Sequence, residues 1–184
     1  MFKSALQPNL VLGGTILRLS PALVQHHQLQ GLILDVDETL VPLREKEVSA
    51  ALLEWAAQIR PVAALWLVSN NISESRIAKI ARALDLPYYY GANKPSRRKL
   101  RQVLTAMQLA PAQVGMVGDR LFTDILAGNR LGLFTILVEP MVDPQPVRAY
   151  GLRHLEVRIS QLFGVSLAEQ QNVAKPDKSP QSEI

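Results

Sequence analysis

The chain has 184 residues, 48% of them hydrophobic and 20% charged, with a formal net charge of +4 and no cysteine. This length suits one domain with a single core, and the lack of cysteine excludes a disulfide framework. No apolar run approaches the roughly 20 residues that a membrane-spanning helix needs. The positive excess favours anionic partners but is modest for a dedicated nucleic acid-binding protein.

The composition changes near the C-terminus, where apolar residues become rare. We therefore expect one folded domain over residues 1–166, with its core at 31–140, and a disordered polar tail at 167–184. The N-terminus carries no secretory pattern, so we expect a cytoplasmic protein. Peripheral contact with the inner face of a membrane stays open.

Short apolar runs alternate with segments of helical periodicity through the middle of the chain. In chain order, we expect strands at 31–35, 62–69, 88–91, 114–117 and 133–138. The helices between them are expected at 48–59, 73–84, 96–107 and 122–131. Ser73 is the expected cap of the second helix, and Ser96 opens the third. Five strands interleaved with helices predict an α/β fold with a doubly wound, five-stranded parallel sheet of Rossmannoid type.

Four polar residues lie at or just beyond the carboxyl ends of these strands: Asp35, Ser69, Lys94 and Asp119. Parallel strands of such a sheet end at one edge, where ligands bind near the point at which strand order reverses. The sequence therefore predicts one pocket that contains all four residues.

Two carboxylates spaced as Asp35-Val-Asp37 can divide the work of phosphoryl transfer. A carboxylate nucleophile needs no deprotonation, and a neighbouring acid can protonate the leaving oxygen and then activate water. We interpret Asp35 as the nucleophile and Asp37 as the general acid and base.

A phosphate dianion and an attacking carboxylate repel each other, so this chemistry requires positive charge in the site. Mg²⁺ suits the available ligands because it prefers oxygen and keeps several waters. We expect Asp35, Asp119 and a loop carbonyl such as that of Asp37 to bind it. Asp124, one turn further on, would join through water or orient the other ligands.

The phosphate group itself needs a cradle of donors. Lys94 offers a mobile point charge that can pair with both the nucleophile and the phosphoryl oxygens. The hydroxyl of Ser69 and the neighbouring Asn70, at a turn that opens a helix, are expected to complete the phosphate-binding set.

These motifs, in this order, resemble those of the haloacid dehalogenase (HAD) superfamily: DVDET at 35–39, VSN at 68–70, KP at 94–95 and GDRLFTD at 118–124. The resemblance covers about residues 31–140 and implies a magnesium-dependent phosphatase with the residue roles given above. Only about 34 residues separate Asp35 from Ser69, and about 25 separate Ser69 from Lys94, which leaves no room for a cap domain. Capless members tend to accept large or surface-bound substrates.

More narrowly, residues 17–30 and 118–140 resemble the YqeG-type subgroup of subclass IIIA, related to phosphatidylglycerophosphate phosphatases. This resemblance implies a lipid headgroup as substrate and phosphatidylglycerol as product. Two positions depart from the common family pattern, Glu38 where Asn is frequent and Ser69 where Thr is frequent. Both bear on substrate choice more than on catalysis.

Other functions stay open on the sequence alone. The phosphomonoester could be a soluble one or part of a protein, and a signalling receiver or a non-catalytic scaffold would carry similar residues. Receivers place the lysine last, which argues against that class, and the occupied catalytic positions argue against a scaffold. A nucleic acid partner is not expected, since the basic cluster at 94–101 contains no aromatic residue.

Five of the eight residues at 94–101 are basic: Lys94, Arg97, Arg98, Lys99 and Arg101. The cluster predicts either a solvated helix face or a surface for an anionic substrate or anionic lipid. Arg97 and Arg98 lie in a first helical turn, where positive charge is mildly unfavourable. Residues 147–163 either cover the sheet or lie on a membrane interface, and packing is favoured. No role is assigned to His26, His27 and His154.

Overall fold

The computed structural model describes residues 5–45 and 47–141. The expected tail at 167–184, the amphipathic segment at 147–163 and His154 lie outside the described residues. No helix in the described part of the chain is long and apolar enough to cross a membrane.

Six parallel strands form one sheet in the described residues, in the order β1-β6-β5-β2-β3-β4. They are β1 (Leu10–Val11), β2 (Gly31–Leu34), β3 (Ala64–Val68), β4 (Tyr88–Tyr89), β5 (Val114–Gly118) and β6 (Phe134–Leu137). The predicted α/β fold with a parallel sheet is confirmed. The predicted count of five strands is wrong, because the two-residue strand β1 is too short to produce a periodic signal.

β1 pairs with β6 at one edge of the sheet, with Leu10 opposite Ile136. Side chains fix this pairing as well as the backbone: Asn9 Oδ1 accepts hydrogen bonds from both N and Oγ1 of Thr135, at 2.8 and 2.9 Å. The segment before the predicted core is therefore part of the sheet.

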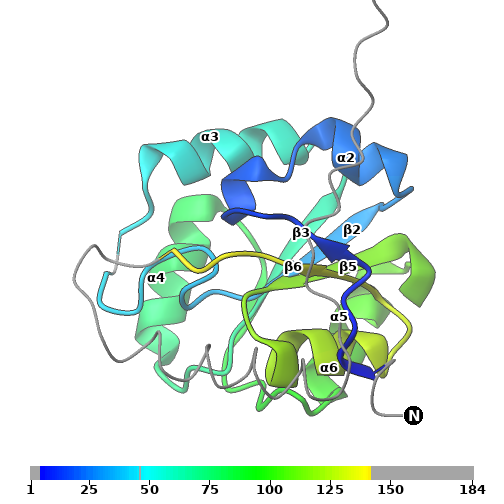
Figure 1. Cartoon of the computed structure of the whole chain (residues 1–184). Helices are drawn as coiled ribbons and strands as arrows, with labels where there is room; N and C mark the ends of the chain where they lie inside the picture. The colour runs from blue at the N-terminus through cyan, green and yellow to red at the C-terminus, as the bar shows by residue number, and fades with distance from the viewer. Residues whose placement is uncertain (1–4, 46, 142–184) are drawn as a thin grey trace, which may run out of the picture.

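Helices cover both faces of the sheet (Figure 1). On one face lie α2 (Pro21–His26), α3 (Ala50–Ile59) and α4 (Glu74–Leu84), and on the other lie α5 (Arg98–Met107) and α6 (Leu126–Asn129). Single short turns η1 (Ile16–Arg18), η2 (Pro111–Gln113) and η3 (Leu121–Ile125) complete the described elements. The sheet is thus the middle layer of three, as expected for a doubly wound fold.

The helices differ from the predictions in capping, start and type. Ser73 occupies the cap position of α4 but its side chain makes no capping bond; Asn71 Oδ1 instead accepts from the Ser73 N–H, at 2.9 Å. α5 begins at Arg98 with Arg97 as its cap residue, later than the predicted start at Ser96. The helix predicted at 122–131 is a π-helical turn, η3, followed by the single turn α6.

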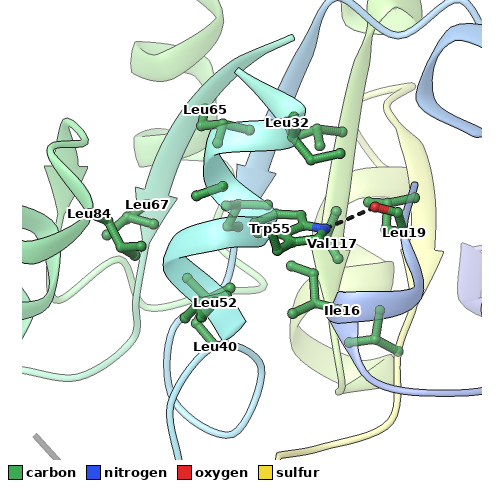
Figure 2. Packing of buried hydrophobic residues seen from close by; sticks show 14 of the residues in the cluster. Ile16, Leu19, Leu32, Leu40, Leu52, Trp55, Leu65, Leu67, Leu84 and Val117 are labelled. Carbon is green, nitrogen blue, oxygen red and sulfur yellow. Dashed lines mark hydrogen bonds between the residues drawn. The ribbon is translucent and has the colours of Figure 1, made fainter. Parts of the chain in front are cut away.

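Trp55 on α3 is central to the larger core cluster, among Ile16, Leu32 and Leu52 (Figure 2). Its indole Nε1 donates to the carbonyl of the buried Leu19, at 2.8 Å. This bond satisfies a buried acceptor in the segment between η1 and α2, as a buried tryptophan usually requires. It attaches the N-terminal segment to the rest of the core.

We expect Trp55→Phe to lower the free energy of unfolding by about 1–3 kcal/mol, because the Leu19 carbonyl would lose its partner. Trp66→Phe is the matched control, since the buried Nε1 of Trp66 has no hydrogen-bond partner among the described residues. Urea unfolding of both variants measures the difference. Equal decreases in the free energy of unfolding would show that the Trp55 hydrogen bond adds nothing to the effect of replacing indole with a smaller ring.

Candidate active site

The predicted site residues meet at the carboxyl edge of the sheet. Asp35 follows β2, Ser69 follows β3, Asp119 follows β5, and Lys94 reaches in from the loop after β4. All four are buried, as is Asp124 on η3. The structure therefore brings together the pocket residues that the strand ends predicted.

Lys94 is the cation at the centre of the site. Its Nζ lies 2.6 Å from Asp35 Oδ1 and 2.7 Å from Asp124 Oδ1, and it donates to the carbonyl of Val68 at 2.9 Å. Burial alone would lower the pKa of Lys94, but the ion pairs with Asp124 and Asp35 outweigh burial and raise it. The ammonium group is therefore charged throughout the physiological range.

Three carboxylates, of Asp35, Asp119 and Asp124, each place one oxygen within 4.8 Å of the others. Burial raises the pKa of Asp35 to about 6 despite the opposing Lys94, and burial with the neighbouring Asp35 and Asp124 raises the pKa of Asp119 to about 8. Three acids thus lie around one ammonium group, which pairs with Asp35 and Asp124. Negative charge is in excess, and the donors are all hard oxygens, so the set suits a small divalent cation such as Mg²⁺.

Thr39 links two of these acids. Its Oγ1 lies 3.3 Å from Asp35 Oδ2 and 3.2 Å from Asp119 Oδ1, and it is fully buried. A hydroxyl has one proton to donate, so Thr39 can serve only one carboxylate at a time. The sequence pattern contained Thr39 but gave it no role.

Gly118 makes room for Asp124. A Cβ at position 118 would lie 2.4 Å from Asp124 Cγ, closer than such atoms approach. Asp124 Oδ2 also accepts from the N–H of Arg120, at 3.3 Å. The π-helical turn and the missing side chain together let the carboxylate fold back over the end of β5.

Asp37 points to a different set of partners from Asp35. Its Oδ2 accepts from Ser69 Oγ at 3.2 Å and from Asn71 Nδ2 at 3.0 Å, and its Oδ1 accepts from Arg76 Nε at 3.0 Å. Its carboxylate is not part of the three-acid cluster. That its backbone carbonyl binds a metal stays a prediction.

Ser69 and Asn70, the two residues after β3, have different hydrogen-bond partners. Ser69 Oγ donates to Asp37 and accepts from the Asn71 N–H at 2.9 Å. Asn70 uses both ends of its amide on Lys94, accepting from its N–H at 2.6 Å and donating to its carbonyl at 3.0 Å. The Asn70 side chain therefore positions Lys94, and a phosphate-binding role for Asn70 stays a prediction that its backbone would have to fulfil.

Comparisons with known proteins agree with this arrangement. The HAD-hydrolase-like family model matches residues 91–142, which include Lys94, Asp119 and Asp124. The probable phosphatase YqeG of Bacillus subtilis is 29% identical over 144 residues, covering 78% of this chain and 84% of YqeG. The predicted resemblance to the HAD superfamily is confirmed. Its predicted enzyme class, a phosphatase of this superfamily, is confirmed, and the receiver and scaffold alternatives are set aside.

One further sequence match is short, and one solved structure matches the fold. Ribonucleotide monophosphatase NagD of Escherichia coli K12 is 50% identical over 52 residues, only 28% of this chain and 20% of NagD. An uncharacterized protein from Listeria monocytogenes serotype 4b superposes with a TM-score of 0.51 at 18% identity, covering 74% of this chain and 100% of that one. The second comparison shows a shared fold alone.

This HAD-like hydrolase has no cap domain within its described residues. Only α3 lies between β2 and β3, and only α4 lies between β3 and β4. The lack of a cap domain that the motif spacing predicted therefore holds for the described residues.

The sequence missed three residues of the hydrolase site: Thr39, Asn71 and Arg76. Thr39 lies four residues after Asp35, and Asn71 follows the recognised Ser69-Asn70 pair, so both stood beside predicted residues. Arg76 lies in the first turn of α4, and nothing in the local sequence distinguishes it from a solvated helix arginine.

The basic cluster at 94–101 has aromatic neighbours that the sequence argument did not count. Lys99 Nζ lies 4.5 Å from the centre of the Tyr89 ring, which stacks on Trp66. A cavity of about 370 Å³ at the edge strand is lined by Glu74, Tyr88, Tyr89, Tyr90, Gly91, Arg98 and Lys99. The lack of aromatics within the segment is therefore no argument against an aromatic or nucleotide-like ligand.

Arg97 donates to the carbonyl of Arg130 at 3.1 Å, which gives it a structural partner, while Arg98 is exposed.

His27 packs against the Phe134 ring, with 4.5 Å between the ring centres, away from the acidic cluster. Burial and the nearby His26 lower the pKa of His27.

Binding of Mg²⁺ should stabilise the protein more at pH 8.5 than at pH 6. The raised pKa values of Asp35 and Asp119 mean that the metal-free site holds protons at pH 6, which a cation must displace. The folded, metal-free protein binds more protons at these two groups than the unfolded chain does. Its free energy of unfolding should therefore fall as pH rises from about 4 to about 8. Thermal unfolding with MgCl₂ or EDTA measures both effects.

For one displaced proton, we expect the apparent affinity to change by up to about tenfold per pH unit below the pKa. In Asp119→Asn this pH dependence should shrink. A magnesium effect that is equal at the two pH values would contradict the charge arrangement described above.

Proposed function

We propose that this HAD-like hydrolase is a Mg²⁺-dependent phosphomonoesterase that works through a phosphorylated Asp35. The observation that carries the proposal is the buried Asp35 carboxylate, with Lys94 Nζ at 2.6 Å on one oxygen and Thr39 Oγ1 at 3.3 Å on the other. An incoming phosphoryl group would meet a nucleophile that is fixed in direction and a cation that offsets its charge. Mg²⁺, held by Asp35, Asp119 and Asp124, would neutralise further negative charge on the phosphoryl oxygens.

The reaction has two balanced steps. An Asp35 oxygen forms a bond to phosphorus while the ester P–O bond breaks, and Asp37 gives its proton to the leaving oxygen. A water oxygen then forms a bond to the phosphorus of the acyl phosphate while the bond between phosphorus and the Asp35 oxygen breaks. Asp37 takes the proton from that water, and inorganic phosphate leaves with the Asp35 carboxylate restored. Ser69 is the residue predicted to bind the phosphate, and its hydroxyl donates to Asp37. It therefore links the phosphate-binding group to the proton-transferring group.

We propose phosphatidylglycerophosphate as the natural substrate. The resemblance to the YqeG-type subgroup supports this choice, and so does the uncapped site. Loops after β2, β3 and β4 expose apolar side chains around the opening: Leu43 is 55% exposed, Ile72 86% and Tyr90 39%. Such side chains can enter the headgroup region of a bilayer, and the exposed Arg98, which lines the same cavity as Tyr90, can attract anionic lipid.

A second candidate substrate is a soluble phosphomonoester whose leaving group occupies the cavity beside β4. The tyrosines and the cations of Arg98 and Lys99 in that cavity favour a leaving group with both ring and anionic character. Nucleotide monoesters have this chemistry.

The deciding experiment measures phosphate release from phosphatidylglycerophosphate in detergent micelles and from a panel of soluble esters that includes nucleotides. Wild type and Asp35→Asn are compared, each with MgCl₂ and with EDTA. Selective release from the lipid, lost in Asp35→Asn, supports the first proposal. Release from soluble esters alone keeps the mechanism and rejects the lipid, and no magnesium-dependent release from either rejects the proposed function.

A further inference from the structure

Asp37 is held by three donors, one of which is charged. Ser69 Oγ and Asn71 Nδ2 both donate to Oδ2, and the Arg76 guanidinium donates to Oδ1 through Nε at 3.0 Å. We infer that Arg76 is a positioning residue for proton transfer by Asp37. The inference rests on the proposed function, in which Asp37 protonates the leaving oxygen.

Arg76 is itself fixed on all sides. Its Nη2 donates to the carbonyl of Pro42 at 3.1 Å and its Nη1 to that of Glu45, so one guanidinium bonds Asp37 and two carbonyls of the loop after β2. Its side chain is only 9% exposed. A planar fork that has an acceptor on each of its three nitrogens holds a single orientation, which a lysine with one point charge cannot reproduce.

The position of Asp37 explains why it needs such a partner. It lies two residues after Asp35, and Glu38 next to it has a left-handed φ of 65° that turns the chain sharply. Rotation of the Asp37 side chain toward Asp35 and Asp119 would add a fourth carboxylate to a cluster already rich in negative charge. The Arg76 contact keeps the Asp37 carboxylate on the side of Ser69, apart from the acidic cluster.

The consequence depends on the leaving group. An ester with a basic leaving oxygen needs a proton in the transition state, whereas p-nitrophenolate leaves without one. Loss of a positioning residue for the acid should therefore slow the first kind of ester and spare the second. Loss of a residue that only stabilises the fold would affect both alike.

The experiment follows the single-turnover release of the phenol from phenyl phosphate and from p-nitrophenyl phosphate by wild type, Arg76→Met, Arg76→Lys and Asp37→Asn. We expect Arg76→Met to slow release from phenyl phosphate by about 10- to 100-fold and from p-nitrophenyl phosphate by less than about threefold. KM should change little, and Arg76→Lys should recover only part of the loss. Asp37→Asn should show the same leaving-group selectivity, more strongly.

Arg60→Met is the matched control, because Arg60 also donates to two backbone carbonyls, those of Leu84 and Asp85, away from the site. It should lower the thermal midpoint less than Arg76→Met, because the Arg60 side chain is 41% exposed, and it should show no leaving-group selectivity. Equal slowing of both esters in Arg76→Met, or no slowing, would overturn the inference while the active wild type keeps the proposed function. A wild type that cleaves neither ester nor the substrates above would instead reject the proposed function itself.

Discussion

Lys94→Met is expected to abolish activity and to destabilise the protein strongly at neutral pH. The side chain of Lys94 is 1% exposed, and its ammonium group contacts both Asp35 and Asp124. Removing one partner of a buried ion pair leaves an uncompensated charge, which costs about 3–5 kcal/mol. Turnover should fall by at least about 10²-fold, because the cation also faces the phosphoryl group in the proposed mechanism.

The loss of stability in Lys94→Met should depend on pH. Without the cation, the buried carboxyl groups of Asp35 and Asp119 would take up protons, and their pKa values are already raised by burial. Because a raised carboxyl pKa favours the folded state at low pH, the variant should recover part of its stability between pH 8 and pH 5. Guanidinium unfolding at several pH values, without metal, measures this recovery.

Lys79→Met provides the control for Lys94→Met. Lys79 pairs with Glu47 at 3.6 Å, but the two side chains are 54% and 87% exposed. Such a pair contributes about 0–1 kcal/mol. If Lys94→Met destabilised the protein no more than Lys79→Met at pH 8, the buried ion-pair network would be energetically unimportant.

Gly118→Ala is expected to weaken Mg²⁺ binding as well as to destabilise the fold. The new methyl group would lie 2.4 Å from Asp124 Cγ, so the carboxylate must leave its place beside Lys94. Overpacking of this kind costs about 1–3 kcal/mol. Displacing one acid of the three-acid cluster should also lower the affinity for Mg²⁺ about tenfold or more, as mutations that disturb the surroundings of a metal site commonly do.

Gly128→Ala separates the two effects. A methyl group there would meet Thr135 Cγ2 at 2.5 Å, a similar clash between α6 and β6 that touches no acid of the site. Titration with MgCl₂, followed by the thermal midpoint, should show near wild-type affinity in Gly128→Ala and weakened affinity in Gly118→Ala. Equal affinities in the two variants would mean that Asp124 is not part of the metal site.

The sheet and the main pocket could be predicted because both follow from local rules. Apolar runs that alternate with helical periodicity define parallel strands, and such strands end at one edge. Asp35, Ser69 and Asp119 had to lie near one another once their strands were placed side by side. Lys94 was placed by its motif and by the short connection after β4.

The parts that could not be predicted depend on contacts between distant segments. Arg76 reaches Asp37 across 39 positions of sequence, and Thr39 reaches Asp119 across 80. The π-helical turn at Asp124 depends on the space above Gly118, which no periodicity reports. In the same way, Lys99 meets Tyr89 only after α5 folds back onto the face of the sheet.

The pairing of β1 with β6 determines where this protein can be shortened for crystallisation or for fusion to a tag. A start at residue 31, the boundary of the family motifs, would remove Ile16, Leu19 and Val24 from the core and the Leu19 carbonyl from Trp55. It would also leave β6 as an unprotected edge, where another chain could add a strand and begin aggregation. Shortened forms should therefore keep the chain from at least Ala5, because Leu6 is buried and the Asn129 side chain donates to the carbonyls of Ala5 and Gln7.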